Sequence, residues 1–485
     1  MALEQQQWVI GIRHKLNQGG QVENDAPWTK HSIYKVPSWM KDGEQPNDDR
    51  IVGYIPEIIS FGPYHRGEPH LQQMEAHKWR VLNHMLNRDT QDITVYLTAV
   101  QELEHTARAC YESPVSSLTS NEFVEMMVLD GCFVLEFLRG TKHEFHNLGY
   151  EEKDPVFYKD SICHVIATDL MKLENQIPLI VLQKLIEIQY IDNPNINKVP
   201  ELVMWVLTPR WITINAPATE KHLNHMRDVV ANEHGSELEP PMVHCLDVFR
   251  RSLMYKPEYR PNTCCGLKLV RDKLIKRLKL VRGKLKWEAK SSDNCEHVMA
   301  NCISDLRKAG VKFKPRNKLP FWDIQFKQCS GVLEIHPFKI DNASETVFRN
   351  LIAFEQCHMN NPWDMVVTNY VAFMDNLIDT ASDVAYLHKA KIIVHYLGSD
   401  QEVADLFNRL VKKVYVNKKT GVLHDVYDKL NEYCSHRRNW WRASLQNEYL
   451  HNPWVIISIF VALLLFLLTA VQTAYTVYAY YKPPS

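Results

Sequence analysis

Glu174, Asn175 and Gln176 interrupt an apolar stretch of the chain, and Pro178 follows two residues later. A carboxylate in apolar surroundings can act as a general acid or base, so the triplet is a candidate for proton-transfer chemistry. A structural role is the alternative, because Pro178 removes a backbone donor and disfavours helical geometry at the residue before it. The freed backbone groups need partners, and the three side chains are the nearest ones. We interpret the triplet as a structural motif.

Metal and nucleotide chemistry find weak support in the sequence motifs. HEFH at 143–146 places its histidines three residues apart, whereas the zinc-protease motif places them four apart on one helix face. Phosphate-binding glycine loops, a nucleophile elbow and the kinase motifs are missing from the sequence. We therefore predict no metal, no cofactor and no small-molecule substrate. The remaining clusters lack a second pair of ligands: Cys295, His297 and Cys302, and the pair His222 and His225.

An enzyme is the alternative prediction, with a site assembled from residues far apart in the sequence, such as Glu174, His77 and Asp375. Spacing arguments do not reveal a site of that kind. A deep pocket with convergent acid and base groups would favour an enzyme. An exposed apolar patch on the body would favour a protein that binds partners.

Charge and cysteine content narrow the class of protein. The 485 residues include 56 Lys and Arg against 57 Asp and Glu, so we predict no nucleic-acid partner. The 11 cysteines are scattered and odd in number, which indicates reduced thiols in a cytosolic body rather than a disulfide framework. The apolar run near the N-terminus is too short for the core of a signal peptide.

Residues 454–475 form an uncharged apolar run that predicts a transmembrane helix. As a helix, this run is about 33 Å long, which matches the hydrocarbon thickness of a bilayer. Aromatic residues occur on both sides of it, as they do at membrane interfaces. The bilayer is thus a predicted partner. The residues that mark the predicted span are Trp454, Phe460, Leu464, Leu468 and Tyr475.

Basic residues before the predicted span indicate its orientation. Arg437, Arg438 and Arg442 precede it, and only Lys482 follows it. Because positive residues stay on the cytoplasmic side, we expect a cytoplasmic body on the plasma membrane or an endomembrane. The short tail at 476–485 would lie on the other side. Such a protein would be tail-anchored and inserted after its synthesis.

A basic amphipathic helix is predicted at 267–290, within an insertion at 235–292. It has ten Lys or Arg and two acids, with an apolar stripe along one side. Such a helix can lie on an anionic membrane surface, or it can pack on the body or bind a protein such as calmodulin. Cys264 and Cys265 at its start are candidates for acylation. The basic residues singled out for the membrane surface are Arg271, Lys276, Arg277 and Arg282.

The rest of the chain predicts a mainly α fold. We expect a flexible N-terminus at 1–30 and a helical domain at 31–450, with Leu170, Leu173 and Ile177 on one helix face and a kink or new helix at Pro178. Further helices are expected at 74–86 and at 121–140, the second beginning at an Asn cap and ending at a Gly. Ser399 and Asp400 are expected to cap another helix, with Glu402 as the capping partner. Alternation from Trp322 to Phe326, with 330–340 and 311–314, predicts a small three-stranded sheet.

Several stretches of the chain match a known family. They include IYKVPSWM (33–40), YIPEIISFGPYHRG (54–67), MMVLDGCFVLEFLR (126–139), DLMKLENQIPLIVLQKL (169–185) and FRNLIAFEQC (348–357). Through these stretches the chain closely resembles the plant family called domain of unknown function 247. That resemblance implies a plant-specific, single-span membrane protein for which no catalytic residues are established. It also implies a recognition role, because grass members look like pollen-side determinants of self-incompatibility. One departure is His336, where similar members have proline.

These observations lead to one functional prediction. We expect a non-enzymatic interaction, signalling or recognition protein, anchored in a membrane and binding protein partners that the sequence does not name.

Overall fold

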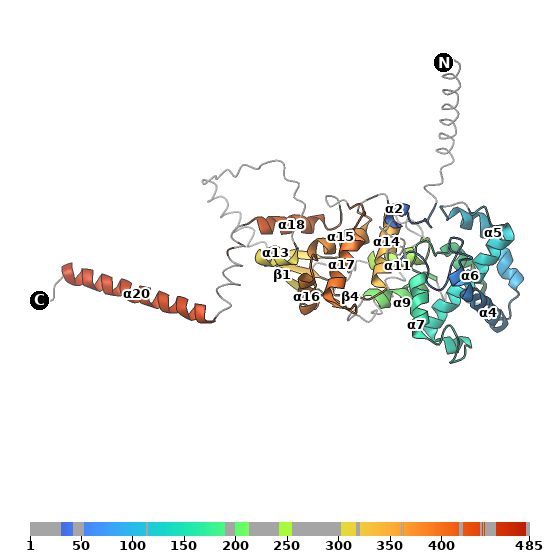
Figure 1. Cartoon of the computed structure of the whole chain (residues 1–485), viewed down its shortest axis with the longest axis horizontal. Helices are drawn as coiled ribbons and strands as arrows, with labels where there is room; N and C mark the ends of the chain where they lie inside the picture. Colours follow the sequence, from blue (N-terminus) through green and yellow to red (C-terminus); the bar gives the residue numbers. More distant parts are fainter. Residues whose placement is uncertain are drawn as a thin grey trace, which may run out of the picture.

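Helices dominate the computed structural model, and two small sheets accompany them within the described residues (Figure 1). The predicted mainly α fold with a small β patch and a C-terminal apolar helix is confirmed. The structure describes residues 31–41, 53–112, 115–189, 199–212, 242–254, 302–316, 321–359, 361, 363–416, 421–436, 439, 441 and 453–481.

The helix α6 (Ser120–His143) is the centre of the first part of the body. Every residue from Met126 to Gly140 is buried, because the sequence is apolar on nearly all faces of this helix. The helix begins with a capping box between Thr119 and Glu122. The predicted Asn cap at 121 and the predicted end at Gly140 are therefore wrong, since the helix runs on to His143. The helices that pack against α6 are α4 (Gln72–Asp89), α5 (Ile93–Ala109), α8 (Leu179–Gln189) and α9 (Val199–Ile212).

The segment around Pro178 separates two helices. Helix α7 (Asp160–Asp169) ends before the polar triplet, and α8 begins immediately after Pro178. A new helix start was one of the two outcomes predicted there. The predicted helical face at Leu170, Leu173 and Ile177 is wrong, because these residues lie in the turns between the two helices. Their side chains are buried nonetheless.

The second part of the body is built from helices that follow residue 242. Helix α11 (Cys245–Met254) packs against α9 and joins the two parts. It lies inside the range 235–292 that we predicted as an insertion, yet its apolar residues are buried, so this part of the range belongs to the core. The helices that follow are α13 (Ile303–Lys308), α14 (Ser344–His358), α15 (Val366–Leu377), α16 (Ala381–Lys389), α17 (Asp400–Leu410) and α18 (His424–Ser435).

Two sheets lie among these helices. The first has strand order β1–β3–β2, in which β3 is parallel to β1 and antiparallel to β2. The strand predicted from the alternation that begins at Trp322 is shorter in the structure, because β2 begins only at Gln325. The second sheet pairs β4 with β5 in parallel and was not predicted. The strands are β1 (Lys312–Pro315), β2 (Gln325–Lys327), β3 (Val332–Ile335), β4 (Phe338–Ile340) and β5 (Ile393–His395).

Short elements and the apolar helix complete the described chain. The apolar helix α20 spans Pro453–Tyr481 and contains the predicted range 454–475. The short elements are α2 (Ser38–Lys41), η2 (Pro69–Leu71) and η3 (Phe145–Leu148).

Several predicted features lie outside the described residues. They are the N-terminal residues 1–30, the basic helix at 267–290 with Arg271, Lys276, Arg277 and Arg282, the candidate acylation residues Cys264 and Cys265, and the clusters around His222 and Cys295.

Candidate functional site

The carboxylate of Glu174 is buried and surrounded by donors. It accepts a hydrogen bond from the backbone amide of Val36 at 2.7 Å and another from the ammonium of Lys41 at 2.5 Å. Nε2 of His65 lies 3.3 Å from its second oxygen. Burial alone would raise the pKa of Glu174, but these partners outweigh burial and hold the pKa below its ordinary value. A carboxylate stabilised in its charged form is poorly suited to act as a general acid at neutral pH.

Asn175 fastens two backbone segments to each other. Its side-chain oxygen accepts from the amide of Phe61 at 2.6 Å. Its amide nitrogen donates to the carbonyls of Ile59 and Asp169, each at 3.0 Å. All three of these side-chain bonds therefore go to backbone groups, which need hydrogen-bond partners where they are buried outside regular structure.

Gln176 connects the same turn to the helix α11. Its amide nitrogen donates to the carbonyl of Leu170 at 2.6 Å and to that of Lys172 at 2.8 Å. Its side-chain oxygen accepts from the amide of Leu246 at 3.2 Å. The carbonyl groups of Asp169, Leu170 and Lys172, at and after the end of α7, thus accept hydrogen bonds from Asn175 and Gln176.

Asp169 and Lys172 extend this arrangement. The Asp169 carboxylate accepts from three successive amides, at Glu57, Ile58 and Ile59, at distances of 2.8 to 3.1 Å. The Lys172 ammonium lies 3.0 Å from that carboxylate and is fully buried. Burial raises the pKa of Asp169, although the lysine opposes that effect. We call five residues the buried clamp: Asp169, Lys172, Glu174, Asn175 and Gln176. Asp169, Lys172 and Asn175 hold residues 55–61 against the turn. Glu174 bonds Val36, and Gln176 bonds the start of α11.

A cysteine and a histidine lie near the clamp but do not form a nucleophilic pair. Tyr34 bonds His358 Nδ1 at 3.0 Å. Burial, together with the negative charges of Glu112 and Glu174, raises the pKa of Cys357 to about 12. Its thiol is protonated at neutral pH, whereas a reactive cysteine needs a thiolate. This electrostatic environment argues against cysteine chemistry at Cys357.

The residues of the enzyme alternative do not come together. Glu174 contacts the groups of the clamp region, whereas His77 lies on α4 beside Arg80. Asp375 lies on α15, close enough to Tyr427 to affect the pKa of that residue. Helices α4 and α15 lie well apart along the body in Figure 1. The three groups therefore do not form one acid–base site.

An open pocket near the HEFH motif was not foreseen from the sequence. It has a volume of about 370 Å³ and receives His146 of that motif. Glu144, which lines the pocket, has a backbone φ of 70°, a value that residues other than glycine rarely adopt. The acidic residues in its lining are Glu144, Glu151, Glu152 and Asp160.

The helix α20 has the length and composition of a membrane span. Within it, Ile457–Tyr478 form an apolar stretch of 22 residues that is 0% buried. Such a stretch of helix is about 33 Å long and would match the thickness of a bilayer's hydrocarbon. Residues of the predicted span are broadly exposed: Trp454 75%, Phe460 74%, Leu464 54%, Leu468 58% and Tyr475 75%.

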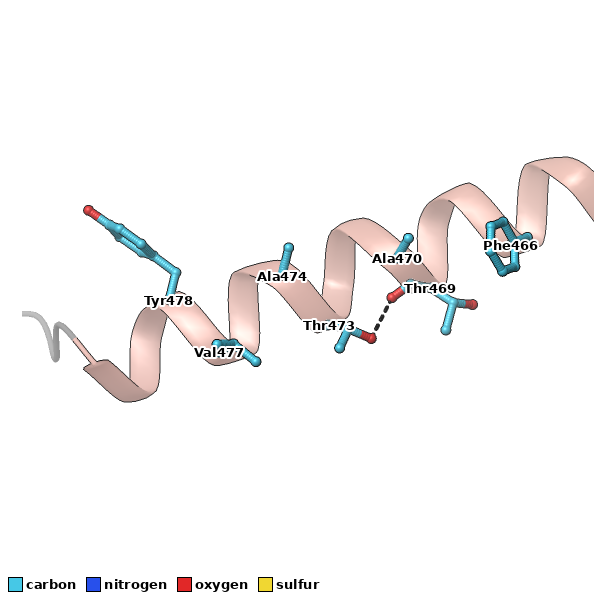
Figure 2. Close-up of a pocket in the computed structure, with 7 residues that line it drawn as sticks. All are labelled: Phe466, Thr469, Ala470, Thr473, Ala474, Val477 and Tyr478. Carbon is cyan, nitrogen blue, oxygen red and sulfur yellow. Dashed lines mark hydrogen bonds between the residues drawn. The ribbon is translucent and has the colours of Figure 1, made fainter. Parts of the chain in front are cut away.

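The serine and threonine hydroxyl groups on α20 are satisfied within the helix. Thr469 donates to the carbonyl of Leu465 and Thr473 to that of Thr469, both at 2.7 Å. Figure 2 shows the second of these bonds, with Ala470 and Ala474 on the same helix. Because hydrocarbon offers no partners, satisfied hydroxyl groups are what a lipid-facing helix requires.

The fold and the apolar helix together define a class: a mainly α body joined to one helix that is long and apolar enough to cross a membrane. The family model described as a plant protein of unknown function, DUF247, matches residues 33–468. The chain therefore belongs to the DUF247 family.

Two relatives from Arabidopsis thaliana extend this comparison. UPF0481 protein At3g47200 is 28% identical over 433 residues, which cover 88% of this chain and 83% of the relative. Putative UPF0481 protein At3g02645 is 26% identical over 525 residues, which cover 97% of this chain and 94% of the relative. No solved structure matches the chain significantly.

Proposed function

We propose that the chain is a membrane-anchored, non-enzymatic interaction protein whose helical body lies on the cytoplasmic face and binds other proteins. The observation that carries this proposal is α20, whose stretch Ile457–Tyr478 has no charge and is 0% buried. An apolar helix of this length left in water would expose an extended apolar surface, so hydrocarbon is its favoured environment.

The orientation follows from the residues that flank α20. Arg437, Arg438 and Arg442 precede the helix, and positive residues close to a span stay on the cytoplasmic side. The family resemblance implies a role in pollen recognition, and that role would require the body to lie outside the cell. The charge distribution favours the cytoplasmic arrangement, with recognition taking place inside the cell.

Two features of the body favour binding over catalysis. The side chains of Asn175 and Gln176 bond backbone groups, and the carboxylates of Asp169 and Glu174 accept from backbone amides as well as pairing with lysines, as a structural role requires. Large apolar side chains are also exposed on the body, and aromatic residues of this kind are frequent in protein interfaces. They include Trp39 (43% exposed), Trp79 (48%), Trp363 (51%) and Tyr415 (67%).

Alkaline carbonate washing tests the anchor. The wild-type chain should stay in the membrane pellet, whereas the double variant Leu464→Arg and Leu468→Arg should move to the supernatant. Each arginine at the centre of the span costs about 2.5 to 3.5 kcal/mol. Tyr478→Arg is the matched control and should stay in the pellet, because an arginine near the end of a span reaches the interface. Wild-type chain in the supernatant would overturn the proposal.

Protease treatment of intact membrane vesicles tests the orientation. A body on the cytoplasmic face is degraded from outside, and a protected body would contradict the assignment. Proximity labelling then tests binding. The control is a reporter fused to residues 453–481 alone, so that proteins labelled only by the full chain are partners of the body. Identical sets of labelled proteins would show that the body recruits nothing.

A further inference from the structure

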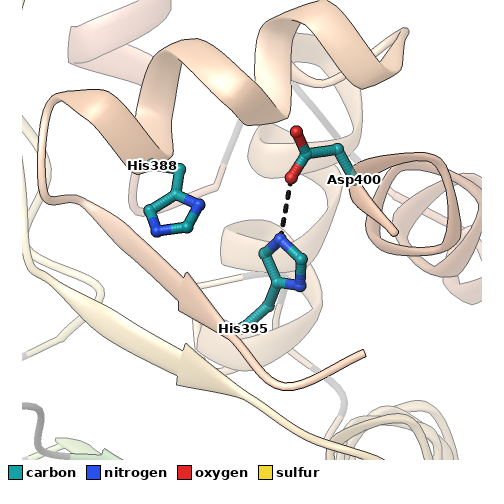
Figure 3. A group of neighbouring side chains, drawn as sticks. All are labelled: His388, His395 and Asp400. Carbon is teal, nitrogen blue, oxygen red and sulfur yellow. Dashed lines mark hydrogen bonds and ion pairs between the residues drawn. The ribbon is translucent and has the colours of Figure 1, made fainter. Parts of the chain in front are cut away.

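Three ligand-forming side chains meet where α16, β5 and α17 approach each other (Figure 3). His388 lies in the last turn of α16, His395 is the last residue of β5, and Asp400 is the first residue of α17. One ligand atom from each residue lies within 4.8 Å of the other two. We propose that these three side chains bind a zinc ion.

The local fold brings the two histidines to the same place. Lys391 adopts a φ of 59°, and its amide bonds the carbonyl of His388 at 2.9 Å, so the chain reverses at the end of α16. β5 then pairs in parallel with β4, with His395 opposite Ile340. The two imidazole rings end 5.5 Å apart between their centroids.

Asp400 completes the group because Ser399 caps α17 and fixes where that helix starts. Its carboxylate lies 2.7 Å from Nε2 of His395. The other nitrogen of His395, Nδ1, is buried and has no hydrogen-bond partner among the described residues. His388 is exposed, and no described residue bonds its ring.

The chemistry of the three groups suits zinc. Two imidazoles and one carboxylate are a common protein ligand set for this ion, with bonds of about 2.0 to 2.2 Å. Ligand atoms around a tetrahedral zinc are then about 3.3 Å apart. For zinc to bind, the Asp400 carboxylate and Nε2 of His395 have to separate from 2.7 Å to about 3.3 Å. The ring of His388 has to move towards these two ligand atoms. Both movements are small, since His388 is exposed and Asp400 is 32% exposed.

Zinc at this position would connect a helix end, a strand end and a helix start. Three protein ligands leave a fourth coordination position open. That position would take a water molecule or a side chain supplied by a partner. The site depends on neither the membrane anchor nor the proposed partner binding, so its test stands apart from theirs.

The experiment uses the full chain in detergent micelles, stripped with a chelator and then titrated with zinc against a chromogenic zinc indicator. The wild-type chain should bind zinc, and His388→Ala should weaken the tightest site at least about tenfold, because even residues behind a ligand contribute 10- to 100-fold. Cobalt in place of zinc should give the visible absorption of a tetrahedral site in the wild type and lose it in His388→Ala.

The matched control is His424→Ala. His424 lies 3.3 Å from Asp428 on α18, but no third ligand accompanies this pair in the described chain. This variant should bind zinc like the wild type, and all three chains should unfold at the same temperature in chelator. Equal zinc affinity of His388→Ala and His424→Ala would overturn the proposal, as would a wild-type chain that binds no zinc.

Discussion

The ammonium of Lys78 on α4 lies 2.7 Å from the carboxylate of Asp130 on α6, and side-chain exposure is 1% for the lysine and 2% for the aspartate. Lys78 also donates to the carbonyl of Ser60, and Asp130 accepts from the amide of Gly62. Burial raises the pKa of Asp130, while the lysine opposes that rise. The pair therefore joins two helices to the loop that the buried clamp also holds.

Removing the lysine should leave an uncompensated charge in the core. Lys78→Met should lower the free energy of unfolding by about 3 to 5 kcal/mol. The double variant Lys78→Met and Asp130→Asn should recover part of this loss, because the amide is neutral and can still accept from Gly62. Chemical unfolding of the full chain in detergent, followed by near-UV circular dichroism, measures both effects. The control Lys308→Met breaks an exposed pair with Asp305 and should change stability by less than about 1 kcal/mol.

Asn175→Ala should destabilise the body more than Glu174→Gln does. The alanine leaves the buried amide of Phe61 and the buried carbonyl of Ile59 without the partner that Asn175 supplied, each costing about 1 to 3 kcal/mol. The carbonyl of Asp169 loses one bond but keeps the one from the amide of Lys172. The glutamine still accepts from Val36 and loses mainly the charge interaction with Lys41. Unfolding of both variants measures the difference. If Glu174→Gln abolished an activity while stability stayed unchanged, our structural interpretation of the triplet would be mistaken.

Gly62 and Gly67 provide a matched pair for testing the close approach of the loop. Both have positive φ, at 74° and 88°. A Cβ on Gly62 would lie 2.7 Å from the carbonyl oxygen of Gln176, whereas a Cβ on Gly67 meets nothing within 4 Å. Gly67→Ala should therefore cost only the backbone strain, about 1 to 2 kcal/mol, and Gly62→Ala should cost clearly more. Equal losses in thermal unfolding would show that the loop can move away from the clamp.

His244 should make the body less stable in mild acid. Burial lowers the pKa of His244 from 6.5 to about 4. The unfolded chain therefore binds a proton at higher pH than the folded chain does. The stabilising contribution is complete above about pH 6.5 and is lost as the pH falls towards 4.

The variant His244→Gln isolates this effect from other histidines. Between pH 6 and pH 4.5, its free energy of unfolding should fall less steeply than that of the wild type, by up to about 1.4 kcal/mol per pH unit. The variant and the wild type are compared at matched denaturant conditions, since only the slope of the unfolding free energy against pH matters. Parallel slopes would show that another group titrates instead.

The helices that could be predicted from the sequence are those whose pattern is local. The apolar run of α20, the buried length of α6 and the cap at Ser399 each depend on residues close together in the chain. Helical period, side-chain hydropathy and capping act over one or a few turns, so the sequence alone determines them. The cap of α6 was misplaced by two residues because Thr119 and Asn121 both precede the same apolar run.

The tertiary structure decided which distant groups meet. Glu174 accepts from the amide of Val36, which is 138 residues away in the sequence, and β4 pairs with β5 across more than fifty residues. The same holds for His388, His395 and Asp400, whose spacing matches no familiar metal motif. Such pairings depend on how whole helices pack. The free energy that favours them comes from contacts throughout the core, so no short sequence pattern predicts them. The sequence by itself thus determined the apolar span and those helices whose pattern is local, and only the packed fold decided what the polar residues do.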